Sequence, residues 1–249
     1  MKITLIQTDI AWADPKTNVR ACEKAITSVP GSDLYVLPEM WSTGFATQPE
    51  GVAESDDGDS LKWMKDIAAR MDAAIAGSIA VKSSADGSYR NRFYFVKPDG
   101  QVSWYDKHHL FTYGGEHHRY TAGDRRVVVE FRGVRFLLLV CYDLRFPVWA
   151  RSHEDYDAIL CVASWPTVRL EAWRALLKAR AIENQCYVAG VNRTGDDPSC
   201  SYSGGTALID PYGRVQECPD YENTTLTSEI DMALLEEFRG KFPVLKDRD

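Results

Sequence analysis

Three residues whose side chains could do chemistry follow apolar segments of the 249-residue chain. Glu39 comes directly after LYVLP, Lys107 after VSWYD, and Cys141 after the run FLLLV. Such runs are typical of buried strands, and side chains just past strand ends converge on the crevice where α/β proteins bind ligands. A carboxylate, an ammonium and a thiol meeting there would suffice for acyl transfer.

The chemistry of the three groups is complementary. A thiol with a pKa of about 8.5 is mostly protonated at neutral pH, so Cys141 needs a base or a nearby cation to react. Glu39 could take the thiol proton and return it to a leaving amine, provided that burial raises its pKa. Lys107 would favour the thiolate and, with the backbone N–H of Tyr142, stabilise the oxyanion of a tetrahedral intermediate.

Each of these residues also has a structural interpretation when it is taken alone. A single buried cysteine such as Cys141 is usually a small core residue. Glu39 alone could cap the following segment or pair with an arginine, and an isolated lysine such as Lys107 is most often a solvated surface charge. The functional interpretation therefore depends on the sequence around all three residues together.

The histidines suggest a different chemistry, a Cys-His dyad or a metal site. His108-His109 and His117-His118 are adjacent pairs, and neighbours in a strand point to opposite faces. No pair has the i, i+4 spacing of a zinc-binding helix, and no cysteine pair accompanies them. The pattern disfavours a metal site, while His117 or His118 stays a candidate for the pocket wall beside Glu116.

Short apolar runs alternate with amphipathic segments along the chain. Asp14 followed by Pro15 has the pattern of an N-cap and a first helical residue. We expect helices over about 14–28, 59–71, 168–185 and 231–239, strands over 2–8, 34–38, 73–81, 158–164, 187–193, 205–213 and 226–231, and hairpins over 92–107 and 127–140. Because hairpins interrupt the alternation, the pattern predicts a layered α/β fold with mixed sheets.

Composition narrows the class of protein. The chain is 45% hydrophobic and has no linker-like or low-complexity tract, which favours one domain over residues 1–249. Its net charge of −7, with basic residues scattered among acids, argues against a nucleic-acid surface. Without a signal peptide or a long apolar run, neither export nor a membrane span is expected. The six cysteines show no CxxC pair, so we expect reduced thiols and a cytoplasmic location.

The segments LPEMWSTGF, DKHHLF and CYDLRFP, in this order, resemble those of the carbon–nitrogen hydrolase (nitrilase) superfamily. KITLIQTDIAWADPKTN, LLKARAIENQCYVAGVNRTG and SGGTALIDPYGRV extend the resemblance over nearly the whole chain. The resemblance implies an α-β-β-α sandwich with two mixed sheets and a catalytic triad of Glu39, Lys107 and Cys141. It also implies that Glu116 orients the lysine, that no metal or organic cofactor is needed, and that the chain forms at least a homodimer.

Longer sequence segments indicate a branch of that family. DKHHLFTYGGEHHRYTAGD and ASWPTVRLEAWRALLKARAIENQCYVAGVNR are similar to omega-amidases, which release ammonia from the terminal amide of 2-oxo acids. Nitrilases usually carry Trp-Glu after the cysteine, whereas this chain has Tyr142-Asp143, which counts against nitrile substrates. Hydrolysis of N-carbamoyl amines or other small amides, a cysteine acyltransferase and a non-catalytic ligand-binding protein stay open as alternatives.

The pocket residues are less well determined by sequence. A 2-oxo acid carries a carboxylate that must be neutralised, and Arg145 is a candidate, although a structural ion pair with Asp143 is favoured for it. Trp165 and Pro166 follow the strand after that of the cysteine and are expected in the pocket wall. The remaining candidates for the wall, each also consistent with a core position, are Tyr113, Phe45 and Trp173.

Overall fold

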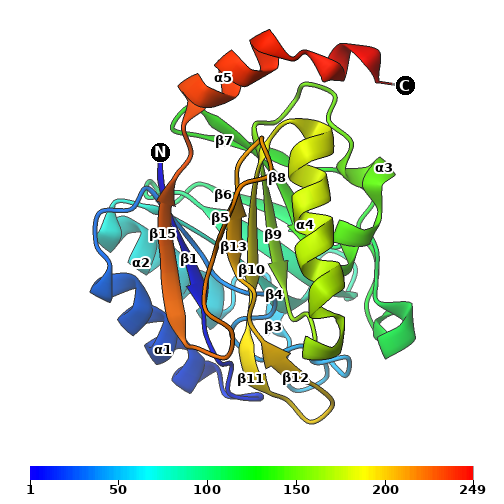
Figure 1. The fold of residues 1–249 in the computed structure, drawn as a ribbon. Helices are drawn as coiled ribbons and strands as arrows, with labels where there is room; N and C mark the ends of the chain where they lie inside the picture. Colours follow the sequence, from blue (N-terminus) through cyan, green and yellow to red (C-terminus); the bar gives the residue numbers. More distant parts are fainter. Residues whose placement is uncertain (249) are drawn as a thin grey trace.

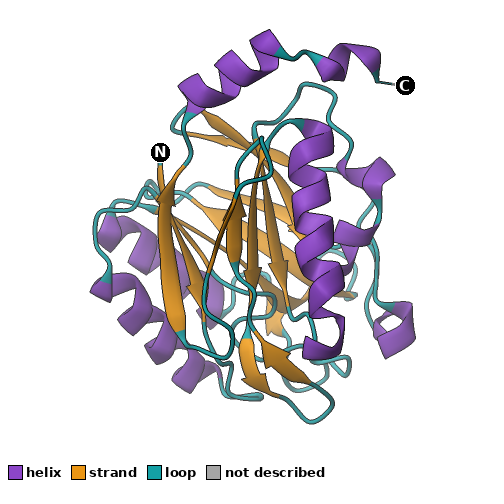
Figure 2. Ribbon diagram, viewed as in Figure 1, coloured by secondary structure: helices purple, strands orange, loops and turns teal. Residues whose placement is uncertain are grey.

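Residues 1–248, which the computed structural model describes, form four layers in the order helix, sheet, sheet, helix (Figure 1). Helices α1 (Pro15–Ser28) and α2 (Asp59–Met71) cover the outer face of one sheet. The other sheet is covered by α4 (Leu170–Asn184) and the short α3 (Pro147–Ala150) (Figure 2). The expected α-β-β-α sandwich of the nitrilase type is therefore confirmed.

The first sheet has seven strands in the order β15-β1-β2-β4-β5-β6, with β3 pairing beside β4. Strands β1, β2 and β4 are parallel neighbours, whereas the remaining pairs on the main path are antiparallel, so the sheet is mixed. Its strands are β1 (Lys2–Gln7), β2 (Leu34–Val36), β3 (Glu54–Ser55), β4 (Ala74–Lys82), β5 (Tyr89–Val96), β6 (Val102–Asp106) and β15 (Thr224–Glu229).

The second sheet has six strands in the order β14-β13-β10-β9-β8-β7 and is also mixed. A separate two-stranded hairpin, β11 with β12, lies beyond the end of β10. The bounds are β7 (Val128–Phe131), β8 (Val134–Val140), β9 (Ala158–Ala163), β10 (Tyr187–Asn192), β11 (Thr194–Asp196), β12 (Ser201–Ser203), β13 (Ala207–Ile209) and β14 (Val215–Glu217).

The continuous apolar run of β8 follows from its position between two layers. Phe136 and Leu138 face the core between the sheets, whereas Leu137 and Leu139 face the core beneath α4. A strand that is buried on both faces has no solvent side to alternate with, so its sequence reads as an unbroken apolar segment. The run therefore fixes the place where β8 ends, at Val140.

Most expected elements are present with shifted ends. The N-cap is confirmed, because the Asp14 carboxylate accepts the Thr17 N–H at 3.1 Å. The sequence missed β3, β11, β12, β14 and the 3₁₀ helices, and the strand expected over 205–213 shortens to β13. The 3₁₀ helices are η1 (Thr112–Gly114), η2 (Glu116–His118), η3 (Cys141–Arg145), η4 (Thr167–Arg169) and η5 (Val244–Asp247), and the last α-helix is α5 (Met232–Lys241).

Within residues 1–248 no helix is long and apolar enough to cross a membrane.

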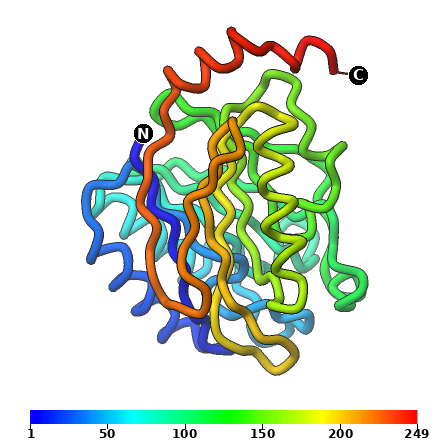
Figure 3. The backbone as a smooth tube through the Cα atoms, in the orientation of Figure 1, coloured from blue at the N-terminus to red at the C-terminus, as the bar shows by residue number. Residues whose placement is uncertain are grey.

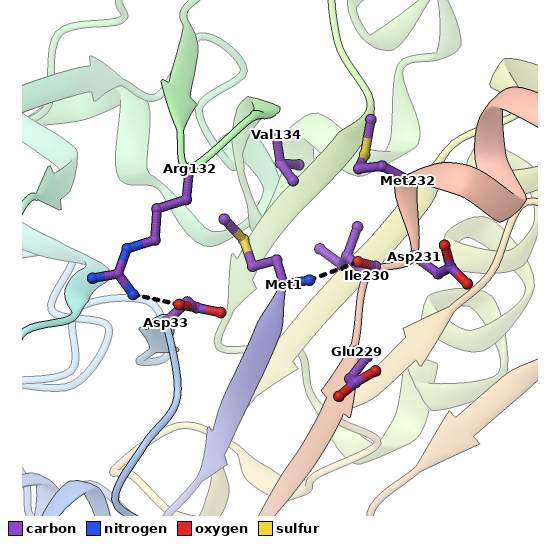
Figure 4. A pocket seen from close by; sticks show the side chains of 8 residues that line it. All are labelled: Met1, Asp33, Arg132, Val134, Glu229, Ile230, Asp231 and Met232. Carbon is purple, nitrogen blue, oxygen red and sulfur yellow. Dashed lines mark hydrogen bonds and ion pairs between the residues drawn. The ribbon is translucent and has the colours of Figure 1, made fainter.

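A contact between Met1 and the residue after β15 lies at the amino ends of the parallel strands. The last strand, β15, lies antiparallel beside β1 (Figure 3), and the Met1 ammonium donates to the Ile230 carbonyl at 2.9 Å. Beside this contact lies a cavity of about 290 Å³, over which Arg132 pairs with Asp33 (Figure 4). It contains no thiol and lies at the opposite end of the strands from Glu39 and Cys141.

Candidate active site

The expected reactive residues all lie beyond the carboxyl ends of strands, and the two sheets share them. Glu39 follows β2 and Lys107 follows β6, both in the first sheet, whereas Cys141 follows β8 in the second. Glu116 arrives from η2, in the loop between Lys107 and the second sheet. The site therefore forms where one end of each sheet meets the other, and the packing of the sheets sets its geometry.

A buried ion cluster forms the floor of the site. The Lys107 ammonium lies 2.9 Å from Glu39 Oε1 and 2.9 Å from Glu116 Oε2, and all three side chains are fully buried. Asn91, on β5, donates through Nδ2 to Glu39 Oε1 at 2.8 Å and to Glu116 Oε1 at 3.2 Å. One ammonium and one amide thus tie the two carboxylates together.

Backbone donors complete the coordination of both carboxylates. Glu39 Oε2 accepts the Ser164 N–H at 2.8 Å, and Ser164 follows β9 of the second sheet. Glu116 Oε2 accepts the Phe111 N–H at 2.6 Å. Because buried charges are tolerated only when they are paired and hydrogen-bonded, this arrangement holds the carboxylates in single positions. The Ser164 contact also ties the two sheets together directly at the site.

The cluster shifts the pKa values of its members in defined directions. Burial alone would lower the pKa of Lys107, but the carboxylates of Glu116 and Glu39 raise it well above its usual range. Burial raises the pKa of Glu116, with Lys107 opposing the shift and Glu39 adding to it. Lys107 is therefore a permanent cation across the accessible pH range.

Cys141 stands at a sharp change of backbone direction. It is the first residue of η3 and has a φ of 47°, in the left-handed region that side chains other than glycine rarely adopt. Burial, together with the negative charge of Glu39, raises the pKa of its thiol well above the usual value, while Lys107 opposes this shift. The resting sulfur is therefore a thiol, and a thiolate requires transfer of its proton.

Asp143 fixes the turn that carries Cys141. Its buried carboxylate accepts the Val140 N–H at 3.0 Å, the His109 N–H at 2.8 Å and the Tyr105 hydroxyl at 2.8 Å. The expected ion pair of Arg145 with Asp143 is wrong, because no such contact exists among the described residues. Arg145 instead lies over the Trp165 ring, at 4.8 Å from its centroid.

A cavity of about 460 Å³ opens over Cys141. The residues expected in the wall from sequence that line it are Tyr113, Tyr142, Arg145, Trp165, Pro166 and Phe45. Trp173 does not line it and packs in the core beneath α4, with its indole N–H bonded to the Gly205 carbonyl at 2.7 Å. Phe45 also covers the ion cluster, since its ring centroid is 5.1 Å from Lys107 Nζ.

Several residues of the site were missed by sequence reasoning. Asn91 lies inside a strand, and Ser164 acts through its backbone, so neither has a local signal. The lining residues that the sequence analysis did not assign to the pocket include Trp12, Thr47, Arg169, Cys200 and Tyr202, which come from separate loops and from β12. Arg169 alone had a detectable signal, since it lies four residues after Trp165 in the same segment.

The histidine pairs lie outside the cavity. His108 stacks on Trp149 with ring centroids 3.7 Å apart, and His109 stacks on Phe146 at 3.8 Å. His117 and His118 are exposed, so the expectation that one of them lines the pocket is wrong. Over residues 1–248 no group of three potential ligands is arranged to hold a metal ion.

Comparison with known proteins gives consistent matches. The family model described as carbon-nitrogen hydrolase matches residues 2–240. The chain is 47% identical over 251 aligned positions to Omega-amidase YafV of Escherichia coli K12, covering 100% of this chain and 97% of that protein. It is 37% identical to the 2-oxoglutaramate amidase of Bacillus subtilis, covering 98% and 96% of the two chains.

A solved structure agrees with the fold in detail. A CN-hydrolase superfamily protein of Xanthomonas campestris, crystallised with an arsenic adduct in its active site, superimposes with a TM-score of 0.96. The two proteins are 41% identical, and the match covers 100% of this chain and 97% of the other. The similarity thus extends over the whole sandwich, including the strand ends that carry the buried ion cluster.

Proposed function

The chain belongs to the carbon–nitrogen hydrolase family, and from this premise we propose that it is an omega-amidase. The substrates are terminal amides of 2-oxo acids, such as 2-oxoglutaramate and 2-oxo-4-methylthiobutanamide, and the products are the free acid and ammonia. Two relatives that match nearly end to end are named for this activity or this substrate. The observation that carries the proposal is the buried Glu39–Lys107–Glu116 cluster beside Cys141 on the cavity wall.

Acylation begins with proton transfer from Cys141 to Glu39. The sulfur forms a bond to the amide carbon, and the carbonyl π-electron pair moves to oxygen. Lys107 has three N–H bonds; Glu39 Oε1 accepts one, the two oxygens of Glu116, at 3.2 and 2.9 Å, share the second, and the third is left for this oxyanion. The N–H of Tyr142, in the first turn of η3, is the second donor. Glu39 then protonates the nitrogen, the C–N bond breaks, and ammonia leaves a thioester on Cys141.

In the hydrolysis of the thioester, Glu39 again acts first as a base and then as an acid. Glu39 takes a proton from water, the hydroxyl oxygen bonds to the acyl carbon, and Lys107 again holds the oxyanion. The C–S bond breaks as the sulfur regains the proton from Glu39, and the acid departs. The proton that Cys141 gives up thus leaves with ammonia, and the proton that Glu39 takes from water restores the thiol, whose raised pKa favours the neutral form.

Glu116 is a positioning residue in this scheme. Its carboxylate holds the Lys107 ammonium at 2.9 Å and is itself held by the Phe111 N–H. The contact fixes the direction of the free N–H of Lys107 toward the position of the oxyanion. A loss of Glu116 therefore changes the orientation of Lys107 without removing a reacting atom.

Ammonia release from a panel of amides tests the substrate class. We expect turnover of 2-oxoglutaramate and 2-oxo-4-methylthiobutanamide, and slower turnover of carbamoylputrescine, simple aliphatic amides and nitriles. Mass spectrometry of protein quenched during turnover is expected to show an acyl mass on Cys141. Failure on every 2-oxo acid amide would refute the omega-amidase assignment and favour the alternative, a hydrolase of N-carbamoyl amines or other small amides.

Two further alternatives give different results in the same assay. A cysteine acyltransferase would form a hydroxamate in the presence of hydroxylamine in place of free acid. A non-catalytic ligand-binding protein would release no ammonia, and Cys141→Ala would bind and behave as the parent does. The ion cluster argues against the second alternative, because burying three charges beside a thiol costs desolvation free energy that ligand binding alone does not require.

We also propose a homodimer formed through the outer face of α4 and α5. The exposed apolar side chains Ile182, Tyr212 and Phe242 gather there around Phe238, whose ring is 4.1 Å from that of Tyr212. Contiguous exposed apolar surface of this kind marks protein interfaces. Phe242→Glu is expected to shift the sedimentation coefficient to that of a monomer, and an unchanged coefficient would exclude this face.

The thiol content supports a cytoplasmic location. All six cysteines are free, and Cys22, Cys161 and Cys186 are among those that are buried. A cysteine nucleophile needs a reducing compartment, because oxidation of Cys141 would end turnover. Fractionation with a tagged full-length chain tests this proposal, and recovery in an oxidising compartment would contradict it.

A further inference from the structure

Two arginines in the wall of the cavity have no partner of opposite charge. Arg145 and Arg169 line it, and no Asp or Glu does so. Arg174, which lines another cavity, differs in this respect, since it lies within 2.7 Å of both Glu217 and Asp220. Throughout the described part of the chain, neither Arg145 nor Arg169 has a carboxylate within ion-pair distance. A protein with a net charge of −7 thus has a locally cationic cavity.

Both guanidinium groups are held against aromatic rings. Arg145 lies 4.8 Å from the ring centroid of Trp165, and Arg169 lies 5.4 Å from that of Phe111. Trp165 is itself fixed, since its indole N–H donates to the Arg169 carbonyl at 2.8 Å and its backbone N–H to Asn192 at 2.7 Å. A guanidinium stacked by its face keeps its N–H bonds free along its edge, where a planar anion can accept them.

We infer that Arg145 and Arg169 form a subsite that binds the carboxylate of the substrate, while Cys141 receives its amide. The ligand class is a small unbranched amide with an anionic planar group at the other end. This inference rests on the proposed function, and it names the residues that bind the carboxylate end of the substrate. Aromatic walls favour this assignment, because a charge pair is stronger where water is excluded.

The length of the substrate is compatible with a single cavity. In 2-oxoglutaramate four carbon–carbon bonds separate the carboxylate from the amide, a span of about 5 Å. Arg145 follows Cys141 by four residues on the same helix η3, and Arg169 is the last residue of η4, where its carbonyl accepts the Trp165 indole N–H. The two arginines and the thiol thus belong to one continuous wall, which also contains Trp165 and Pro166.

The test compares 2-oxoglutaramate with 4-oxopentanamide, in which a methyl group replaces the carboxylate. For Arg169→Met and Arg145→Met we expect kcat/KM on 2-oxoglutaramate to fall about 30- to 100-fold each, chiefly through KM, because each loses a charge-assisted hydrogen bond. The value for 4-oxopentanamide is expected to change less than about threefold. Arg169→Lys, which keeps the charge but loses the planar fork, is expected to lie between parent and Arg169→Met.

Arg20→Met is the matched control, because Arg20 is an exposed arginine on α1 outside the cavity. It removes the same positive charge, and kcat/KM for both substrates is expected to stay unchanged. Thermal unfolding of each variant separates loss of binding from loss of fold. Equal losses on the charged and uncharged amides, or no loss on either, would overturn the subsite.

A binding measurement separates this inference from the proposed function. Cys141→Ala cannot form the thioester, so titration with 2-oxoglutarate, the product, measures binding without turnover. We expect Arg169→Met in that background to weaken the binding of 2-oxoglutarate at least tenfold. If the parent hydrolyses no 2-oxo amide while this loss is seen, the function fails and the subsite stands. If the parent is active and 2-oxoglutarate binds equally to both proteins, the subsite alone is refuted.

Discussion

At the scale of residues, the site depends on one ammonium that two carboxylates share. Lys107 lies 2.9 Å from each of Glu39 and Glu116, and the three groups together carry one net negative charge when both carboxylates are ionised. That charge faces the thiol of Cys141 and contributes to its raised pKa. A negative charge beside a thiol is the arrangement that the proposed proton transfer from Cys141 to Glu39 requires.

The first prediction concerns Glu39→Gln. The amide cannot accept the thiol proton, so kcat is expected to fall about 10²- to 10⁴-fold. Because the charge of Glu39 raises the thiol pKa, its removal is expected to lower the pKa of Cys141. Thiolate absorbance as a function of pH measures this directly. A thiol pKa that rose in Glu39→Gln would contradict the role given to that charge.

The second prediction concerns Glu116→Gln, which leaves every reacting atom in place. Lys107 loses one of the two carboxylates that raise its pKa and keeps only Glu39. We expect kcat to fall about 10- to 100-fold with KM little changed, because the oxyanion donor is misoriented. Steady-state kinetics of ammonia release give both constants. An effect on KM alone would assign Glu116 to substrate binding.

At the scale of elements, the positions of the strand ends determine the geometry of the site. The loop after β2 carries Glu39 past β4, and Gly77 of β4 leaves no space there for a side chain. A Cβ at Gly77 would lie 2.9 Å from both Leu37 Cβ and Trp41 Cδ1. The Met40 N–H is fixed to Ser78 Oγ at 2.9 Å in the same place. The backbone on both sides of Glu39 is thus held by its contact with β4.

The third prediction follows from this contact. Gly77→Ala is expected to destabilise the protein by about 1–3 kcal/mol, since the loop must move to admit a methyl group, and to reduce activity by displacing Glu39. Gly240→Ala is the control, because a Cβ at Gly240 in α5 meets no atom within 4 Å. Denaturant unfolding and ammonia release measure the two effects. A fully active Gly77→Ala protein would show that the loop adapts freely.

The limits of sequence-based prediction are visible at this scale. Glu39, Lys107 and Cys141 could be found because each follows a predicted strand and lies in a segment that resembles the carbon–nitrogen hydrolase superfamily. Asn91 could not be found, since a polar residue inside β5 becomes meaningful only when two loops place carboxylates beside it. The strands β11 and β12 pair locally, but each has only three residues, too few to show a periodic apolar pattern. Local pattern thus predicts elements, whereas long-range packing selects the remaining members of the site.

At the scale of the whole molecule, the relative position of the two sheets determines whether the site is assembled. Glu39 and Lys107 belong to one sheet and Cys141 to the other, and the core between the sheets joins them. Asp157, before β9, ties this assembly to α5 by accepting Arg135 Nη2 at 2.7 Å and Arg239 Nη1 at 3.0 Å. The global fold is therefore held partly by a buried carboxylate with two arginine partners.

The fourth prediction concerns the pH dependence of that contact. Burial alone would raise the pKa of Asp157, but the hydrogen bonds and charge of Arg135, with Arg239, lower it. A carboxylate with a lowered pKa stabilises the fold above its unfolded pKa and loses this contribution as the pH falls through its folded pKa. Asp157→Asn is expected to cost about 3 kcal/mol at neutral pH and progressively less in acid.

Unfolding in denaturant at several pH values measures this difference. Asp66→Asn is the control, since Asp66 is an exposed partner of Arg70 on α2. The control is expected to change the free energy of unfolding by less than about 0.5 kcal/mol at every pH. A difference between parent and Asp157→Asn that stayed constant into acid would refute the ion-pair explanation.

The pairing of β15 with β1 has a consequence for the order of events during synthesis. Lys2 lies opposite Glu229, so β1 leaves the ribosome long before the strand that pairs with its edge. Until then one edge of β1 presents unpaired backbone groups, which can capture another nascent chain. Contacts between such distant segments also slow folding, because a long loop must close before they form. A chain stalled on the ribosome before Thr224 would contain every residue of the ion cluster but would still have an open sheet edge. Such a chain is expected to bind chaperones.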